Sequence, residues 1–252
     1  MEEVKSLHIS ELSSQDLIDL QNRLPDAVRD CESLEDAAQQ YMSLLYETLE
    51  NALVLARLFV TVPFRQLPEH SKSCVLDLSC KQGIGQLITG DVPVLSLIGS
   101  RGREASWNYR QGSAGHVGIP LASRDSIHQI PMISRLLKQM DVGLDWIESK
   151  DPEHILRTWE RISGVFYVED AGADEDDEGR KIISSQDFVA TYGVKTVFGY
   201  GGGYLRSPHF FTAILFARET VPIRIAERFV CQANIFKTET MRHVEAGRIF
   251  NP

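Results

Sequence analysis

The sequence lacks both a long apolar run and a cluster of basic residues. No apolar stretch approaches the roughly 20 residues that span a bilayer, so we expect no membrane partner. The N-terminal residues MEEVKSLHIS are acidic and polar, whereas a signal peptide is basic and then apolar, and this predicts a cytoplasmic protein. The net charge of −9 and the scattered Lys and Arg residues predict no nucleic-acid partner, because phosphate binding needs clustered cations.

Cysteine is also scarce. The four cysteines are scattered, and the closest pair, Cys74 and Cys80, has five residues between its members. The members of a zinc-binding pair are usually separated by roughly two to four residues, so we expect no structural metal. We interpret Cys31, Cys74, Cys80 and Cys231 as small buried hydrophobic residues, with a redox role for the Cys74 and Cys80 pair as the alternative.

The usual glycine motifs for phosphate binding are absent as well. VKTVFGYGGGYL, residues 194–205, fails as a dinucleotide fingerprint, because the sixth position counted from Gly199 is Tyr204 and not glycine. A P-loop requires Gly-Lys-Ser or Gly-Lys-Thr ahead of a helix, whereas a second strand-like run, residues 209–217, follows here. We interpret the segment as a β-hairpin with a glycine turn, and close approach of a ligand to its backbone is the alternative.

The spacing of apolar residues predicts two helices at the start of the chain. The first follows Ser13 and Ser14 and ends before Pro25. The second covers residues 34–60, begins with a capping pattern of Ser33 and Asp36, and ends at Val62-Pro63. Since this helix is nearly thirty residues long, we expect its apolar stripe to pair with a second copy of the chain. The stripe consists of Tyr41, Leu44, Leu45, Leu49, Ala52, Leu53, Leu55, Ala56 and Phe59.

After residue 74 the pattern changes from helical to mixed. We expect short strands over residues 74–78, 92–100, 116–121 and 164–170. Helices are predicted over residues 126–140, with Pro131 near the first turn, over residues 152–162, and after a Thr220 cap through Phe236. The acidic residues 174–179 are expected to form a solvated loop. This order of elements predicts an α+β fold with an antiparallel sheet and its helices on one face.

A family resemblance supports this fold class. Residues 192–236 resemble the closing half of a GAF domain, which has a strand, a turn, a strand and then a helix. Together with SWNYRQGSAGHVGIPL, IPMISRLLKQM and the glycine hairpin, they resemble a bacterial GAF/PAS-like input module of the kind found ahead of histidine kinase and other signalling domains. The resemblance covers roughly residues 34–237, and it implies a long helix that precedes the sheet and often pairs between subunits.

The most unusual loop follows the second predicted strand. It contains Trp107, Asn108, Arg110, Ser113 and His116 within a glycine-rich segment. A guanidinium, an imidazole and an indole face together could bind an anionic or aromatic small molecule. The alternative is structural, with the indole at the edge of the core and the arginine stacked on it.

Two further pairs of residues suggest a site of another kind. His128 lies four residues before Met132, and one helix face carrying both could ligate a non-covalent haem, although core packing is the commoner role of such residues. Ser113 and His116 could act as nucleophile and base, yet Gly112-Ser113-Ala114-Gly115 lacks the Gly-x-Ser-x-Gly spacing.

From these observations we predict a non-catalytic, small-ligand-binding or sensor module of a bacterial signalling system. It would act alone or through a signalling partner, and as a homodimer. We divide the chain into a helical extension (1–32), a GAF-like sensor domain (33–240) and a tail (241–252). The alternatives are a small-molecule hydrolase or transferase that uses the loop from Trp107 to His116, a haem sensor, or a purely structural module. No motif implies a cofactor.

Overall fold

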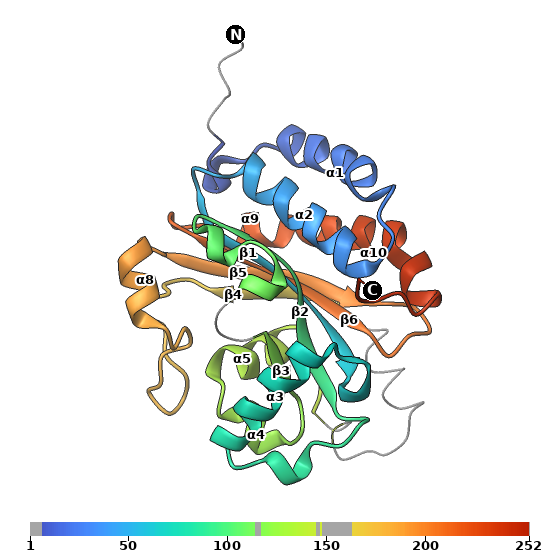
Figure 1. Ribbon diagram of the computed structural model, residues 1–252. Helices are drawn as coiled ribbons and strands as arrows, with labels where there is room; N and C mark the ends of the chain where they lie inside the picture. Colours follow the sequence, from blue (N-terminus) through green and yellow to red (C-terminus); the bar gives the residue numbers. More distant parts are fainter. Residues whose placement is uncertain (1–6, 114–116, 145–146, 148–162, 252) are drawn as a thin grey trace.

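The computed structural model describes residues 7–113, 117–144, 147 and 163–251. Its centre is a six-stranded sheet in the order β3-β2-β1-β6-β5-β4, and each pair of neighbours is antiparallel (Figure 1). The predicted α+β class and antiparallel sheet are confirmed. The strands are β1 Leu53–Pro63, β2 Pro93–Gly102, β3 Gly118–Pro120, β4 Ser163–Val168, β5 Thr196–Gly203 and β6 Phe210–Ala217.

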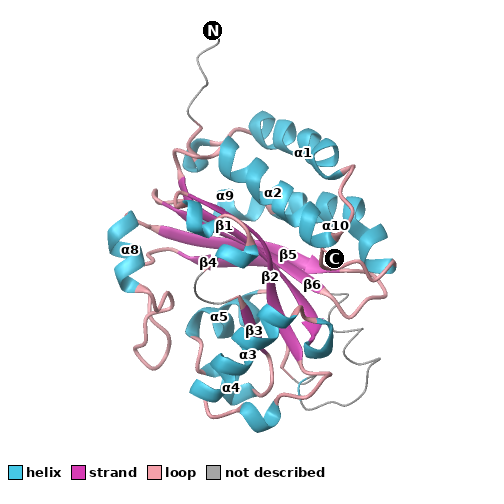
Figure 2. Ribbon diagram, in the orientation of Figure 1, coloured by secondary structure: helices cyan, strands magenta, loops and turns pink. Residues whose placement is uncertain are grey.

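Helices cover both faces of this sheet, so the prediction of helices on one face was wrong (Figure 2). One layer contains α1 Ser14–Val28, α2 Leu34–Thr48, α9 Ile223–Arg228 and α10 Val230–Glu245. The opposite side carries α4 Arg124–His128, α5 Pro131–Gln139 and α8 Gln186–Tyr192. Helix α3 Glu69–Lys81 lies beside β3 and contributes Val75 to the cluster on the α2 side. Each layer buries its own apolar cluster against the sheet, because alternate side chains of a strand point to opposite faces.

The largest correction concerns the long helix predicted over residues 34–60. It is capped by Ser33 as expected, but α2 ends at Thr48 and the chain becomes β1 at Leu53. Strand β1 pairs with β2 on one side and β6 on the other, and this pairing overrides the helical spacing of its Leu and Ala residues. The apolar stripe assigned to a dimer lies in the chain's own core, from Tyr41 in α2 to Phe59 in β1, so it offers no surface for a second copy.

Other boundaries differ from the sequence pattern for packing reasons. Helix α1 has the expected cap at Ser13 but continues through Pro25, because its buried face extends to Val28. The strand predicted over 74–78 is part of α3, whose buried residues Ser71, Val75 and Ser79 follow helical spacing.

The later helices are interrupted where one helix was expected. The predicted helix over 126–140 is broken between α4 and α5, and the final helix is broken between α9 and α10. Pro222, and not Thr220, precedes the first residue of α9. The helix predicted over 152–162 lies outside the described residues.

The hairpin and the acidic loop are where the sequence predicts them. Strands β5 and β6 pair over their whole length, but the glycines lie inside β5, and the turn runs over residues 204–209. A Cβ at Gly201 would lie 2.0 Å from the Phe211 carbonyl oxygen, so glycine lets β6 approach closely. Residues 174–179 form a loop, in which Asp176 pairs with Arg180 and Glu175 with Lys181.

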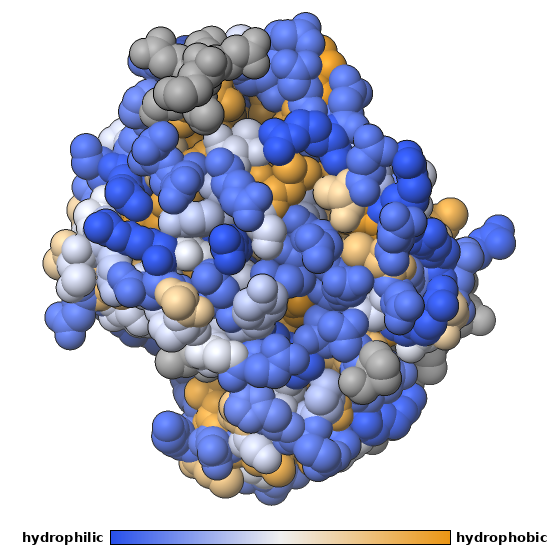
Figure 3. Space-filling model, turned by 45° about the horizontal axis from the view of Figure 1, so that its top comes forward, coloured by the Kyte–Doolittle hydropathy of each residue, from blue (hydrophilic) through white to orange (hydrophobic). Residues whose placement is uncertain are grey.

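Most of the large apolar side chains are buried, and the visible surface is mainly hydrophilic. Hydrophilic residues cover most of the face in Figure 3, and apolar ones show between them. None of the helices in the described part of the chain has the length and apolar character needed to cross a membrane.

The cluster beneath α2 and α10 contains a buried pair of tyrosines. The hydroxyls of Tyr41 and Tyr200 lie 2.5 Å apart, and the Tyr41 ring stacks on Phe236 at 5.2 Å between centroids. Burial raises the pKa of both phenols, so both stay neutral at physiological pH.

We predict that Tyr200→Phe lowers the free energy of unfolding by about 1–3 kcal/mol, because the Tyr41 hydroxyl would be left buried without its partner. The double variant Tyr41→Phe/Tyr200→Phe should lose less than the sum of the single variants. Urea unfolding of the four proteins measures this coupling. Strictly additive losses would show that the two hydroxyls do not depend on each other.

We also predict a pH dependence from His209 in the β5–β6 turn. Its ring Nδ1 donates to the Thr61 carbonyl oxygen at 2.6 Å, and burial lowers its pKa below the ordinary 6.5 despite this bond. The unfolded chain therefore takes up the proton first, and stability should fall as the pH drops from about 6.5 toward the lower folded pKa. His209→Gln should flatten this dependence in unfolding experiments between pH 7 and 5, whereas His70→Gln, at an exposed position, should not. Equal slopes for the His209 variant and the wild type would contradict the assignment.

Candidate functional site

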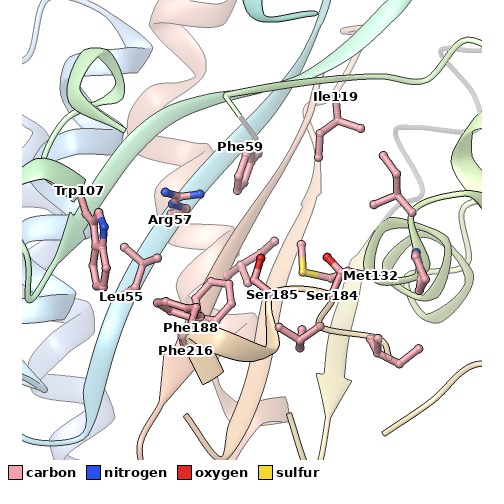
Figure 4. Close-up of a pocket in the computed structure, with 15 residues that line it drawn as sticks. Leu55, Arg57, Phe59, Trp107, Ile119, Met132, Ser184, Ser185, Phe188 and Phe216 are labelled. Atoms are coloured by element: carbon pink, nitrogen blue, oxygen red, sulfur yellow. The ribbon is translucent and has the colours of Figure 1, made fainter. Parts of the chain in front are cut away.

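A cavity of about 250 Å³ lies on the face of the sheet opposite α2 and α10 (Figure 4). Its described lining is mostly aliphatic and aromatic, with one guanidinium and two hydroxyls among the side chains. These residues are Leu55, Arg57, Phe59, Trp107, Ile119, Ile130, Pro131, Met132, Ile182, Ile183, Ser184, Ser185, Phe188, Ile214 and Phe216.

The two central strands form the floor of this cavity. Leu55, Arg57 and Phe59 are alternate residues of β1, so their side chains share one face of the sheet. Ile214 and Phe216 contribute in the same way from β6, and Ile214 is the direct cross-strand neighbour of Arg57. The cavity therefore lies against the middle of the sheet and not at its edge.

Two segments from the second layer form the walls. Helix α5 begins with Pro131 at a position where its missing N–H costs little, and this start places Ile130 and Met132 against the cavity. The segment before α8 contributes Ser184 and Ser185, which are exposed to solvent. We therefore identify these two serines as the rim of the cavity.

Aromatic rings close one end. The Trp107 ring lies 5.6 Å from Phe188 and 4.7 Å from Tyr192 between centroids, both edge to face, and Phe188 lies 5.5 Å from Phe216. Such offset contacts are favourable beyond the area that they bury. The cluster joins the loop after β2 to α8 and β6.

Arg57 is the electrostatic centre of the site. Among the described lining residues it alone carries a charge, and burial lowers its pKa to about 10. It is therefore still protonated at physiological pH, in surroundings that disfavour its charge.

Sequence reasoning missed Arg57 because residues 53–63 were interpreted as the end of a helix. One signal could have found it. LVLARLFVTVP is an eleven-residue run in which arginine is the only charged residue, and a charge inside an apolar run of this kind is rare in a buried strand.

The predicted loop residues are brought together only in part. Trp107 lines the cavity, whereas the Asn108 side-chain oxygen accepts a hydrogen bond from the Gly102 N–H at 3.0 Å and so holds the loop on β2. Ser113 donates to the Tyr109 carbonyl oxygen at 3.0 Å. His116 lies outside the described residues.

Arg110 lies away from the cavity lining, in a buried ion pair with Glu35 at the start of α2. Its Nε and Nη2 donate to the two carboxylate oxygens at 2.9 and 3.0 Å, and its Nη1 donates to Ser71 at 3.1 Å. The guanidinium also lies 5.3 Å from the centre of the Phe250 ring. Its described contacts are thus to α2, to α3 and to the C-terminal segment.

His128 and Met132 do not share one helix face. His128 ends α4 at an exposed position and its Nε2 lies 2.5 Å from Glu178, whereas Met132 belongs to α5 and lines the cavity. The chain leaves helical geometry between them, so the one-turn spacing behind the haem hypothesis is not present.

The cysteines are less buried than the sequence analysis predicts. Cys80 and Cys231 are exposed, Cys31 and Cys74 are half-buried, and all are free thiols. Burial raises the pKa of Cys31 to about 12, so its thiolate is disfavoured. In the described part of the chain, no three His, Cys, Asp or Glu side chains are grouped to hold a metal ion.

We predict that Gly102→Ala disturbs the aromatic end of the cavity. A Cβ at this position would lie 2.9 Å from both the Trp107 ring and the Leu55 side chain, so one of them must move. We expect a loss of about 1–3 kcal/mol in unfolding free energy and a weaker near-ultraviolet circular dichroism signal. Gly143→Ala is the matched control, because a Cβ there meets no described atom within 4 Å. Unchanged spectra for Gly102→Ala would show that Trp107 is not held against β2.

No family model matches the sequence, and no curated protein matches it. Among solved structures, the chain is similar to the free methionine-R-sulfoxide reductase of Neisseria meningitidis, with 9% identity, 96% of this chain and 99% of that chain covered, and a TM-score of 0.47. It is also similar to the GAF domain of an Acinetobacter phosphoenolpyruvate-protein phosphotransferase, with 12% identity, 94% and 100% covered, and a TM-score of 0.46. A phycoerythrobilin-bound GAF domain of a cyanobacterial phytochrome gives 12% identity, 94% and 99% covered, and a TM-score of 0.45. The α+β class with an antiparallel sheet, which the sequence predicts, is shown by the arrangement of the described elements.

Proposed function

We propose that this chain is a non-catalytic sensor module that binds a small molecule in the cavity between the sheet and α5. The observation that carries the proposal is the cavity itself, which is lined mainly by aliphatic and aromatic side chains with a few polar groups among them. Binding sites for small molecules usually have this composition, because apolar walls supply affinity and a few polar groups fix the orientation.

The position of the cavity suits a sensor. Its lining comes from β1, β3, β6, α5, α8, the segment before α8 and the loop after β2, which are far apart in the sequence. A ligand that touches all of them would stabilise one relative placement of these elements over others.

A connected set of contacts leads from the cavity to the C-terminal segment. Trp107 lines the cavity, and Arg110, three residues later, is paired with Glu35. Glu35 also accepts from the Asn251 backbone N–H at 3.1 Å and donates its own N–H to the Ile249 carbonyl oxygen at 2.8 Å. We propose that a signalling partner reads the occupancy of the cavity through this segment.

The test uses indole as a neutral probe and isoleucine methyl groups as reporters. Ile119, Ile130, Ile182, Ile183 and Ile214 line the cavity, whereas Ile9 and Ile249 belong to the cluster on the other face of the sheet. We predict that indole shifts the methyl NMR signals of the lining set and leaves those of Ile9 and Ile249 unchanged.

A variant that blocks the rim supplies the control. Ser185→Trp should weaken indole binding at least tenfold, because Ser185 lies where the cavity meets solvent. Ser73→Trp, at an exposed position of α3, should bind like the wild type. Shifts confined to isoleucines outside the cavity, or equal binding by both variants, would refute the proposed site.

A further inference from the structure

The aromatic side chains of the cavity give information about the ligand. Phe59, Trp107, Phe188 and Phe216 all line it, and Trp107 and Phe188 are only half-buried. Figure 4 shows Phe188 beside Phe216, and their ring centroids lie 5.5 Å apart. The described lining thus presents aromatic surface from the sheet, from α8 and from the loop after β2 to one space.

We propose that the cavity binds an uncharged bicyclic aromatic compound, whose flat ring system lies among Phe59, Trp107, Phe188 and Phe216. This inference rests on the proposed function, because it names the class of ligand for the same cavity.

An aromatic ligand suits these walls better than a saturated one. The rings of Trp107 and Phe188 are inclined at 66°, and those of Phe188 and Phe216 at 88°. Rings that are steeply inclined to one another offer both faces and edges to the space between them. A flat ligand ring can meet a face with its edge and an edge with its face, and such contacts are favourable beyond the area that they bury.

The charge of the lining favours a neutral ligand. Arg57 is the one charged side chain of the described lining, and it already interacts with another group of the chain. The guanidinium therefore does not depend on an anion from outside, and its positive charge would repel a cation. Any ion would also lose its hydration against mostly apolar walls, and that loss is costly unless the ion is paired.

The volume and the rim set the size and the orientation of the ligand. A cavity of about 150 Å³ is enough to hold benzene, and this one measures about 250 Å³. A second fused ring therefore fits. Ser184 and Ser185 lie at the rim, so an uncharged polar substituent such as an amide would lie there, within reach of hydroxyl groups and of water.

The first experiment compares three indoles that differ in charge but hardly in shape. At neutral pH indole-3-carboxamide is uncharged, indole-3-carboxylate is an anion and indole-3-methanamine is a cation. We expect the wild type to bind the amide at least tenfold more tightly than either ion in titration calorimetry. An ion that binds as tightly as the amide would overturn the inference and leave the cavity proposal intact.

A second comparison tests the ring contacts. 2-Naphthol and decahydro-2-naphthol share one carbon skeleton and are both uncharged at neutral pH, but only the first is flat and aromatic. We expect the wild type to bind 2-naphthol at least tenfold more tightly. Phe188→Leu keeps an apolar side chain and should reduce this ratio at least threefold. Phe64→Leu, which changes a half-buried phenylalanine packed against the other cluster, should keep the ratio of the wild type.

The outcomes separate this inference from the proposed function. A wild type that binds the saturated alcohol as tightly as the aromatic one, or a ratio that Phe188→Leu leaves unchanged, would contradict the aromatic ligand while the cavity remains a binding site. If Phe188→Leu does not fold, the preferences of the wild type decide. A wild type that binds none of these compounds and shows no indole-dependent methyl shifts would overturn both.

Discussion

The pairing of β1 with two partners that are distant in sequence governs the rest of this structure. Residues 55–63 of β1 pair with β2, and residues 53–60 pair with β6, about 150 positions later. Because β1 is hydrogen-bonded along both sides, its side chains must alternate between the two faces of the sheet. That alternation separates the cluster beneath α2 from the cavity beneath α5, and it presents Arg57 to the cavity.

A second constraint joins the start of α2 to the C-terminal segment. Glu35 at the start of α2 accepts from Arg110 and from the Asn251 N–H, while backbone bonds from Leu34 and Glu35 reach residues 248 and 249. Buried ion pairs add little net stability compared with apolar packing, but losing one partner is costly because the other charge stays buried. The pair therefore specifies how the loop after β2, α2 and the C-terminal segment fit together.

The two faces of the sheet differ in how tightly they are packed. One face of the sheet is packed with large side chains such as Tyr41, Tyr200 and Phe236, which leave little room for a ligand. The other face carries the cavity, whose floor is rigid because it belongs to the central strands, and whose rim belongs to a loop. A rigid floor with an adaptable rim is the arrangement that loops on a scaffold provide in many binding proteins.

Where contacts are local, the sequence by itself determined the outcome. Ser13 and Ser33 cap the helices that follow them. Residues 92–100 and 164–170 overlap the strands β2 and β4. The acidic residues 174–179 form a loop at the surface. The α+β class follows from the order of such elements. The physical reason is that caps, turns and charge repulsion act between residues only a few positions apart.

Only the tertiary structure decided that the helix does not continue through residues 49–63, that Arg110 pairs with Glu35, and that Arg57 lines the cavity. The Leu and Ala residues of β1 suit a helix locally, and pairing with β2 and β6 makes them a strand. Arg110 could not be assigned to Glu35, 75 positions away, from spacing alone. The cavity itself exists only where several elements meet, and no local pattern encodes a volume that is enclosed by residues more than 150 positions apart, such as Leu55 and Phe216.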